Sequence, residues 1–409
     1  MTESGNSPEI LIAGGGSAGL CAALAIAQNA PGLTVEVVDA KAGGAGSDER
    51  ASAIAAAARR MLERLGVWAE LAAEAQPVTS MEITDSGTGD TVRPVFLTFA
   101  TDVGAGEPFA HMVENGRLTA ALESAAITAG VRITRPERVE HFEATGTDIR
   151  VVFGSGGERR PRLLVAADGI RSRLRGLAGI RTVSWSYPQI AIVATVRHER
   201  PHGGKAIEHF LPNGPFAILP LSGNRSSLVW TERKEEGERL MAGDDFVFSI
   251  ELERRFGHEL GALTLDGPRQ AFPLGLTLAR DFVRPRFALL GDAAHGIHPI
   301  AGQGLNLGFR DVAALAEAVV DAARLGLDPG TEEVLARYQR WRRYDTWQMG
   351  VTTDLLNRLF SNDLMPIRTL RDLGLGIVDR IPRLKRMFIG EAAGFGGGAL
   401  PKLLRGEPI

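Results

Sequence analysis

The 409-residue chain contains a single cysteine, Cys21. One cysteine excludes an intramolecular disulfide framework and any Cys-x-x-Cys pair, and it is typical of a reducing cytoplasm. The sequence also lacks low-complexity tracts and fixed-period repeats, which excludes a solenoid or fibrous architecture. Its net charge of −3 gives no reason to expect nucleic acid as a partner, because nucleic-acid binding normally needs a basic face.

Long apolar runs of the kind that cross a membrane are not found either. Residues 10–35 carry no charge, but no Lys or Arg precedes them, and four glycines close together break the run (Gly14, Gly15, Gly16 and Gly19). A buried strand, a glycine turn and a buried helix explain this segment better than a signal peptide. We therefore expect a cytoplasmic protein, with peripheral contact at the inner face of the membrane left open.

The N-terminal glycine motif has the context of a dinucleotide-binding site. Residues 9–13 form an apolar run, residues 14–19 (GGGSAG) match G-x-G-x-x-G, and residues 34–39 (TVEVVD) predict a second strand that ends in Asp39. In such a β-α-β unit the glycines allow a tight turn, close approach of the pyrophosphate and close packing of helix on strand. Asp39 is expected to accept a ribose hydroxyl. The residues expected at the phosphates are Gly14, Gly16, Ser17, Ala18 and Gly19.

A second glycine-rich segment follows a later strand. Residues 287–290 predict a buried strand, and residues 305–325 predict a long helix. Asp292, between them, is placed to hold a hydroxyl of a flavin ribityl chain, and the helix N-terminus can direct its dipole at the N1/C2 side of the isoalloxazine. Small residues there keep the backbone bare enough for a flat ring. The flavin contacts expected from this segment are Gly291, Asp292, Gly302, Gly304, Leu305 and Asn306.

Other candidates for chemistry are weaker. His295 and His298 lie three residues apart, but no third ligand accompanies them, so we expect no metal site. A second G-x-G-x-x-G is not found in the sequence, so a nicotinamide donor is expected to bind transiently. No general base stands out, and the catalytic side chains are left open.

The remaining segments predict an inserted sheet and a helical end. Apolar residues at helical spacing predict a helix over residues 51–65. Short alternating strands are expected over residues 78–109 and again over 187–231. From Tyr338 onward the chain looks helical. Its basic segment, residues 366–390, fits a membrane-surface helix and a packed amphipathic helix equally well.

These motifs, with the turn Ala167-Asp168-Gly169, resemble the three fingerprints of the class A flavoprotein monooxygenases, the para-hydroxybenzoate hydroxylase type. The resemblance implies that Asp168 and Gly169 lie near FAD and the nicotinamide. It also implies that Arg50 reaches toward the flavin and that Asn115 begins a second flavin-contacting helix.

A narrower similarity links longer stretches to the ubiquinone-biosynthesis hydroxylases. They include DERASAIAAAARRMLERLGVW, LPNGPFAILPLSGNRSSLVW and GDAAHGIHPIAGQGLNLGFRDVAALAE, and the similarity runs from about residue 9 to about residue 405. It implies tight, non-covalent FAD and a transient reductant, NAD(P)H or another. The implied reaction is hydroxylation of the ring of a polyprenyl phenol or quinone precursor by O₂ through a flavin C4a-hydroperoxide. The ring position stays open.

Three alternatives to this function also stay open. They are a class A hydroxylase of a soluble phenolic compound, a flavin reductase of prenyl double bonds with the same fold, and a non-catalytic flavoprotein. The last would act as an assembly partner, and a complex with other quinone-biosynthesis enzymes is left open in every case.

The expected fold class is α/β: a Rossmann-type FAD-binding domain of discontinuous segments, an inserted mixed β-sheet substrate domain and a helical C-terminal region. We assign residues 1–75, 101–183 and 270–340 to the FAD-binding domain. Residues 76–100 and 184–269 are assigned to the substrate domain, and residues 341–409 to the helical region.

Overall fold

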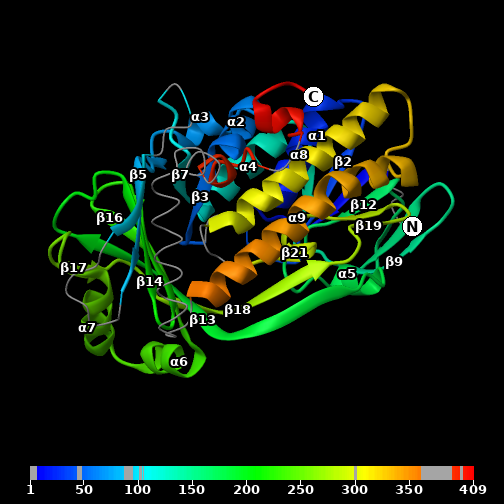
Figure 1. Cartoon of the computed structure of the whole chain (residues 1–409). Helices are drawn as coiled ribbons and strands as arrows, with labels where there is room; N and C mark the ends of the chain where they lie inside the picture. The colour runs from blue at the N-terminus through cyan, green and yellow to red at the C-terminus, as the bar shows by residue number, and fades with distance from the viewer. Residues whose placement is uncertain are drawn as a thin grey trace.

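A parallel sheet and a larger, mixed sheet, antiparallel except for the pair β14–β5, divide the molecule into the two parts seen at the right and left of Figure 1. The computed structural model describes residues 7–43, 48–86, 95–100, 104, 106–298, 302–360, 389–396 and 399–409. Most of the basic segment, residues 366–388, therefore lies outside the described residues. None of the described helices is both long and apolar enough to cross a bilayer.

The parallel sheet has the strand order β19-β20-β12-β1-β2-β8. Its strands are β1 (Ile10–Ala13), β2 (Val35–Val38), β8 (Arg132–Thr134), β12 (Leu163–Ala166), β19 (Val283–Arg284) and β20 (Phe287–Leu289). All pairs are parallel except the edge pair β19–β20. The central strands are apolar along their whole length because helices cover both faces of the sheet.

Helices from distant parts of the sequence cover this sheet. Helix α1 (Ser17–Asn29) packs against both α4 (Asn115–Thr128) and α8 (Gln303–Arg324), and α9 (Glu332–Phe360) packs along α8. Figure 1 shows α8 and α9 side by side, and the C-terminal turn η3 (Lys402–Arg405) packs against α8. An antiparallel sheet of β9 (Val139–Ala144), β10 (Ile149–Phe153) and β11 (Glu158–Arg159) and the short helix α5 (Arg173–Leu177) complete this part.

The larger sheet has the order β21-β18-β13-β16-β15-β14-β5-β6, with β17 beside β13. Its strands are β5 (Ser80–Asp85), β6 (Val95–Ala100), β13 (Thr182–His198), β14 (Lys205–Leu211), β15 (Gly214–Leu221), β16 (Arg225–Arg233), β17 (Leu263–Leu265), β18 (Gln270–Ala279) and β21 (His295–Gly296). Helices α6 (Lys234–Ala242) and α7 (Asp245–Phe256) cover its outer face, where Phe216, Trp230 and Phe248 form the core.

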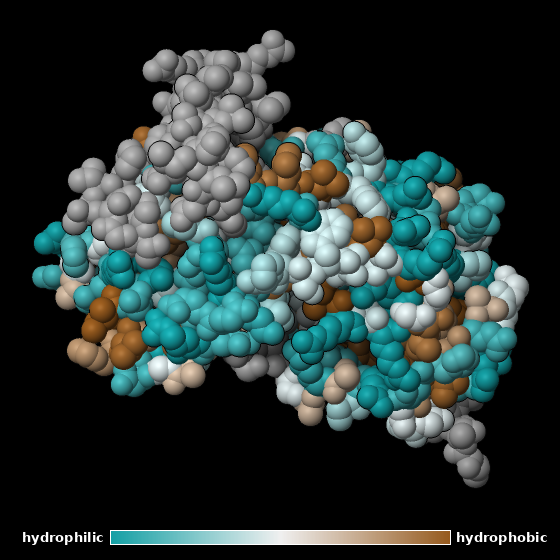
Figure 2. All heavy atoms as spheres, turned by 60° about the horizontal axis from the view of Figure 1, so that its bottom comes forward, coloured by the Kyte–Doolittle hydropathy of each residue, from teal (hydrophilic) through white to brown (hydrophobic). Residues whose placement is uncertain are grey.

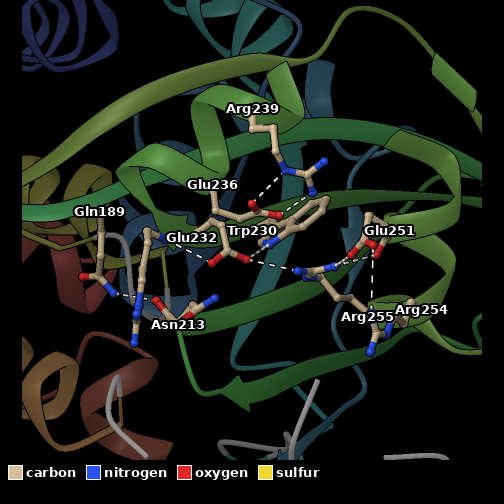
Figure 3. Close-up of polar contacts among 10 residues, drawn as sticks. Gln189, Asn213, Trp230, Glu232, Glu236, Arg239, Glu251, Arg254 and Arg255 are labelled. Atoms are coloured by element: carbon tan, nitrogen blue, oxygen red, sulfur yellow. Dashed lines mark hydrogen bonds and ion pairs between the residues drawn. The ribbon is translucent and has the colours of Figure 1, made fainter. Parts of the chain in front are cut away.

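A buried ion pair lies among these aromatic rings. Glu232 and Arg255 are almost fully buried, with 3.2 Å between an Oε of Glu232 and an Nη of Arg255. The guanidinium of Arg255 lies 4.4 Å from the Trp230 ring centroid, and the indole Nε1 donates a hydrogen bond to Glu232. Figure 3 shows that Glu251, from α7, reaches the same guanidinium. Both charges are thus paired, and the guanidinium also lies over an aromatic ring.

One element differs from the sequence prediction. We expected a single helix over residues 51–65, whereas β3 (Ala51–Ala55) is a strand and α2 (Ala56–Arg64) follows it directly. Alanines favour a helix, but β3 pairs antiparallel with β7 (Ala110–Glu114), which also pairs with β4 (Gln76–Pro77). Tertiary pairing therefore overrides local propensity at this position.

The expected α/β class, with a parallel sheet built from discontinuous segments, is confirmed. The division into domains stays a prediction. The topology adds that β18, which we assigned to the FAD-binding domain, is hydrogen-bonded to β13 in the larger sheet.

The surface is mainly hydrophilic, with separate hydrophobic patches (Figure 2). One patch lies at the left of this view, on the side where Figure 1 shows α7. At the start of α7, Phe246 is 74% exposed and Ile250 is 50% exposed, with Val247 between them. An exposed apolar helix start of this kind marks a candidate contact surface.

Candidate functional site

The first glycine turn is closed by the neighbouring strand end. A Cβ on Gly14 would lie 2.1 Å from the Ala167 carbonyl oxygen, and one on Gly19 would lie 2.0 Å from the Gly14 carbonyl oxygen. Gly14 also has φ +126°, a value that favours glycine. Gly16, by contrast, is exposed, and a Cβ there would meet no protein atom within 4 Å among the described residues. The turn therefore needs its first and third glycines for packing, while the second leaves an open surface.

That open surface lies at the N-terminus of α1. Gly16 is the N-cap residue, and no described side chain caps this end of the helix. Ser17 and Ala18 follow, both partly accessible, and the Ser17 hydroxyl is 2.8 Å from that of Thr119 in α4. The first amides of a helix lack partners within the helix, and its dipole favours negative charge there. This geometry fits a pyrophosphate.

Asp39 follows β2 and stands beside the turn. A Cβ on Gly15 would be 2.5 Å from a carboxylate oxygen of Asp39, so the acid lies directly against the glycine motif. Its carboxylate accepts a hydrogen bond from the Lys41 amide and lies 3.8 Å from Nε of Arg135. Asp39 remains partly accessible, as a ribose-binding carboxylate must be.

The turn after β12 lies against the first glycine motif. The Asp168 amide nitrogen is 3.1 Å from the position of a Cβ on Gly14. The Asp168 carboxylate is exposed and accepts a hydrogen bond of 3.2 Å from the Leu174 amide at the start of α5. Gly169 has φ +80°, which explains the glycine after the acid. The structure thus brings the first and second fingerprints together.

The third fingerprint reaches the same place through Gly291. This residue has φ +59°, and a Cβ on it would lie 3.3 Å from the Ala18 Cβ. Asp292 follows in the 3₁₀ turn η1 (Gly291–Ala293). Its side chain is accessible to solvent, and yet burial among protein atoms raises its pKa, with His295 and Arg50 opposing the rise. A carboxylate that is both accessible and surrounded by protein lies in a recess, which fits a bound polyol chain.

Arg50 is held at the border between the two sheets. It pairs with Asp48, with 2.6 Å between Nη2 and Oδ2, and its guanidinium lies 5.0 Å from the ring centroid of Phe272 in β18. Hydrogen bonding to Asp48 raises the pKa of Arg50, to which the charge of Asp292 also contributes. Asn115 donates to Asp48 and accepts from Ser52, so its amide fixes the arginine's partner.

The start of α8 presents bare backbone. Gly302 is a left-handed N-cap with φ +62°, and a Cβ on Gly304 would meet no described atom within 4 Å. Leu305 is partly accessible. The Asn306 side chain is buried and hydrogen-bonded to β3. It accepts a hydrogen bond from the Ala55 amide at 2.9 Å and donates one to the Ala53 carbonyl at 2.8 Å. Any contact of Asn306 with a cofactor therefore has to come from its backbone.

A buried ionic network supports this loop, and the sequence did not indicate it. Nε2 of His295 lies 2.6 Å from Oδ2 of Asp311, whose other oxygen accepts from Nε of Arg342 at 2.7 Å. The chain of pairs continues to Asp345 and Arg310. Burial alone would raise the pKa of Asp311, but His295 and Arg342 together lower it. These partners come from α8 and α9, far apart in sequence, which is why no local motif reveals them.

The two histidines lie in different surroundings. His298 is fully buried, neither ring nitrogen has a hydrogen-bond partner in the described part of the chain, and its ring meets that of Tyr187 edge-on at 5.5 Å. Burial lowers its pKa to about 4. Among the described residues, no group of three or more His, Cys, Asp or Glu side chains is placed to hold a metal ion.

Taken together, the fingerprint residues fit a dinucleotide. A cavity of about 320 Å³ lies elsewhere, between α3 (Trp68–Leu71), α4, β7 and β15, and it touches none of the three fingerprints. The fingerprint residues combine an uncapped helix N-terminus and open glycines with two accessible carboxylates, Asp39 and Asp292. Their roles as individual contacts stay predictions.

Comparisons with known proteins point in one direction. The family model described as "FAD binding domain" matches residues 7–352. The ubiquinone hydroxylase UbiL of Rhodospirillum rubrum is 46% identical over 98% of this chain and 93% of its own. The 3-demethoxyubiquinol 3-hydroxylase of Escherichia coli is 35% identical over 95% of this chain and 99% of its own. The solved structure of p-nitrophenol 4-monooxygenase PnpA of Pseudomonas putida has a TM-score of 0.80, with 96% of this chain and 99% of that one covered; at 18% identity it shows the fold alone.

Proposed function

The chain belongs to the FAD-binding domain family, among the flavin-dependent hydroxylases of ubiquinone biosynthesis, and from this premise we propose that it hydroxylates the aromatic ring of a polyprenyl phenol or quinone precursor of ubiquinone. The observation that carries the proposal is similarity along nearly the whole length of two such hydroxylases. The open recess between the three fingerprints supports it, because it offers FAD a place beside the larger sheet.

The residues of this chain have separate tasks in the proposed reaction. The amides at the start of α1 would hold the pyrophosphate, Asp39 the ribose and Asp292 the ribityl chain. The dipole of α8 would stabilise negative charge on the reduced ring, because its N-cap Gly302 and the bare Gly304 allow close approach. When bound, FAD supplies the reduction of O₂ and the transfer of one oxygen atom to the substrate.

The electron donor is part of the proposal. A nicotinamide nucleotide would bind only transiently, near the accessible Asp168 carboxylate. Arg50 supports this placement, because it lies between the flavin recess and Phe272 of the larger sheet and carries a charge that attracts a phosphate.

Peripheral contact with a membrane is a further part of the proposal, because a polyprenyl substrate resides in lipid. The apolar start of α7, where Phe246, Val247 and Ile250 are exposed, supports it. Assembly with other enzymes of quinone biosynthesis would use a surface of the same kind.

Complementation tests the proposal. In E. coli that lacks its 3-demethoxyubiquinol 3-hydroxylase, expression of this chain should restore ubiquinone and remove the ring precursor that accumulates, as measured by mass spectrometry of lipid extracts. A Gly304→Val variant should fail, because a branched side chain would fill the bare backbone where the flavin ring lies. Ubiquinone levels could stay low although the chain is expressed and binds FAD. In that case the chain is expressed in strains that lack other ring hydroxylases, and mass spectrometry of their lipid extracts decides whether it acts at another ring position. Failure in every strain would contradict the proposed function.

A further inference from the structure

The face of the larger sheet that is turned toward the flavin recess can be identified from strand register. Trp230 and Phe216 pack under α6 and α7, so the alternate residues of the same strands lie on the opposite face. Phe272 belongs to that opposite face, since it is in register with Ala191, and it carries Arg50 above its ring. Side chains on this face therefore lie toward the predicted flavin site.

One of these side chains is a carboxylate. Glu208, in β14, alternates with Ile207, which belongs to the outer core. Glu208 is only 4% exposed. No hydrogen bond or ion pair joins it to any of the described residues, and burial is the sole cause that raises its pKa, to about 7. Burying a carboxylate without a partner lowers the stability of the folded state, so such a residue calls for a ligand or a functional reason.

The residues paired with Glu208 in the two neighbouring strands carry no charge. Glu208 is in register with Ala217 in β15 and with Ile83 in β5, a small and an uncharged residue. The nearest titratable group along β5 on the same face is Asp85, which pairs in register with Phe210. Ala206, two residues before Glu208, packs in a cluster with Ala53 of β3.

Ala53 connects this position to the start of α8. Its carbonyl accepts the Asn306 amide, and its Cβ is 3.5 Å from the position of a Cβ on Gly302. β3 therefore connects the start of α8 with the part of β14 that carries Ala206 and Glu208.

A second polar group on the same face also lacks a partner. Thr231, in β16, is 2% exposed, and its hydroxyl oxygen is buried with no hydrogen-bond partner among the described residues. It is in register with Ala191 in β13, and Ala191 is in turn in register with Phe272 in β18. A carboxylate and a hydroxyl, both without a partner among the described residues, therefore lie on the same face of the sheet in strands two apart, as recognition of a ring bearing oxygen substituents requires.

We propose that Glu208 binds the ring hydroxyl of the phenolic substrate and accepts its proton, with Thr231 hydrogen-bonded to a second ring oxygen. This inference rests on the proposed function. In the step, the phenol O–H bond breaks and an O–H bond forms on the carboxylate, which leaves a phenolate and a neutral Glu208; no electrons are exchanged. The phenolate is the more electron-rich ring and therefore the better partner for an electrophilic oxygen.

A binding experiment on the FAD-loaded protein tests this without turnover. A short-chain 2-methoxyphenol is titrated in, and ultraviolet difference spectra report whether the bound probe is phenol or phenolate. The parent should bind it as phenolate above about pH 7. Glu208→Gln should bind it about tenfold more weakly and as neutral phenol. Glu208→Asp keeps the carboxylate and should retain the phenolate spectrum with reduced affinity.

A matched control is Glu82→Gln, in the adjacent strand β5. Glu82 is in register with Ile207, so it lies on the outer face, where it pairs with Lys205; its replacement should leave the probe spectrum unchanged. Unaltered affinity and a phenolate spectrum in Glu208→Gln would overturn the inference, as would a neutral bound phenol in the parent. Hydroxylation of a quinone precursor by the parent is measured separately. If the parent hydroxylates the precursor and Glu208→Gln does so at the same rate at every pH, the inference about Glu208 is wrong and the proposed function stands. If the parent binds phenolate but hydroxylates no precursor, the proposed function is wrong and the inference about Glu208 stands.

Discussion

His295 and Asp311 lie 2.6 Å apart, Nε2 to Oδ2, and neither side chain is exposed to solvent. The same Asp311 oxygen accepts the amide hydrogen of Gly291 at 3.0 Å. One buried carboxylate on α8 thus fixes both the backbone turn and the imidazole on either side of Asp292. The flavin loop is positioned from beneath by a charge that no solvent reaches.

Removing that charge should destabilise the fold in a pH-dependent way. Asp311→Asn removes the buried charge that both His295 and Arg342 contact, so we expect a loss of about 3–5 kcal/mol in the free energy of unfolding at neutral pH. The pKa of Asp311 is lowered below its ordinary 3.8, so its contribution is present above that value and disappears as pH falls through the lower folded pKa. Urea unfolding at pH 7 and below pH 3.8 measures both effects. Asp281→Asn, which removes a half-exposed pair with Arg284, should cost less than about 1 kcal/mol; an equal loss in both variants would contradict the assignment.

Two glycines of one turn should respond oppositely to the same substitution. Gly14→Ala places a methyl group 2.1 Å from the Ala167 carbonyl oxygen at φ +126°, so it should lower the stability of the protein itself. Gly16→Ala meets no described atom within 4 Å and should fold like the parent. Its methyl group would instead obstruct the pyrophosphate and weaken FAD binding about tenfold or more. Thermal unfolding without FAD and flavin titration separate the two effects. Normal FAD affinity in Gly16→Ala would place the pyrophosphate elsewhere.

Asp292→Ala should weaken FAD retention without harming the fold. The substitution removes a charge-assisted hydrogen bond to the ribityl chain, which is on the order of 1.5–3 kcal/mol. Because burial raises the pKa of this accessible carboxyl, its removal should leave the ligand-free protein as stable as before or slightly more stable. Flavin fluorescence during dilution measures the affinity. Equal affinity in variant and parent would exclude Asp292 from the site.

Glu208 should leave a signature in stability even without substrate. Its pKa rises from 4.5 to about 7 on folding, so the folded state keeps a proton that the unfolded state releases. Its contribution to stability is therefore full below about pH 4.5 and is lost as pH rises toward 7, a change of roughly 3 kcal/mol. Glu208→Gln should remove this decline. Denaturant unfolding of parent and variant at pH 5 and pH 8 tests it, and parallel pH profiles would mean that the carboxyl is solvated.

The glycine fingerprints could be read from the sequence because each depends on a local turn. Gly14, Gly169 and Gly302 all have positive φ, a property that residue type reports directly. β3 could not be read in this way, since Ala51–Ala55 is a strand only because β7 pairs with it. Asn306 shows the same limit: its position in the motif was clear, but its side chain is used to hold β3.

Glu208 could not be identified as a site residue from the sequence, for a different reason. A single Glu in a strand is common on exposed faces, and alternation alone does not tell which face is covered. Only the register from β14 across to Phe272 and Arg50 places it toward the flavin recess. The buried partners of Asp311 are hidden likewise, because Arg342 lies on another helix.

The strand order of the parallel sheet also constrains how the protein is made. β20 pairs with β12 through Phe287 and Leu164, although the whole larger sheet except β5, β6 and β21 is encoded between them. During synthesis, β1 and β12 can pair as soon as they leave the ribosome, but the turn with Asp292 arrives only after the inserted strands have emerged. The nascent chain must therefore keep one edge of a hydrophobic sheet uncovered while a second sheet folds. Chaperone dependence and proteolysis during expression should be concentrated in that interval.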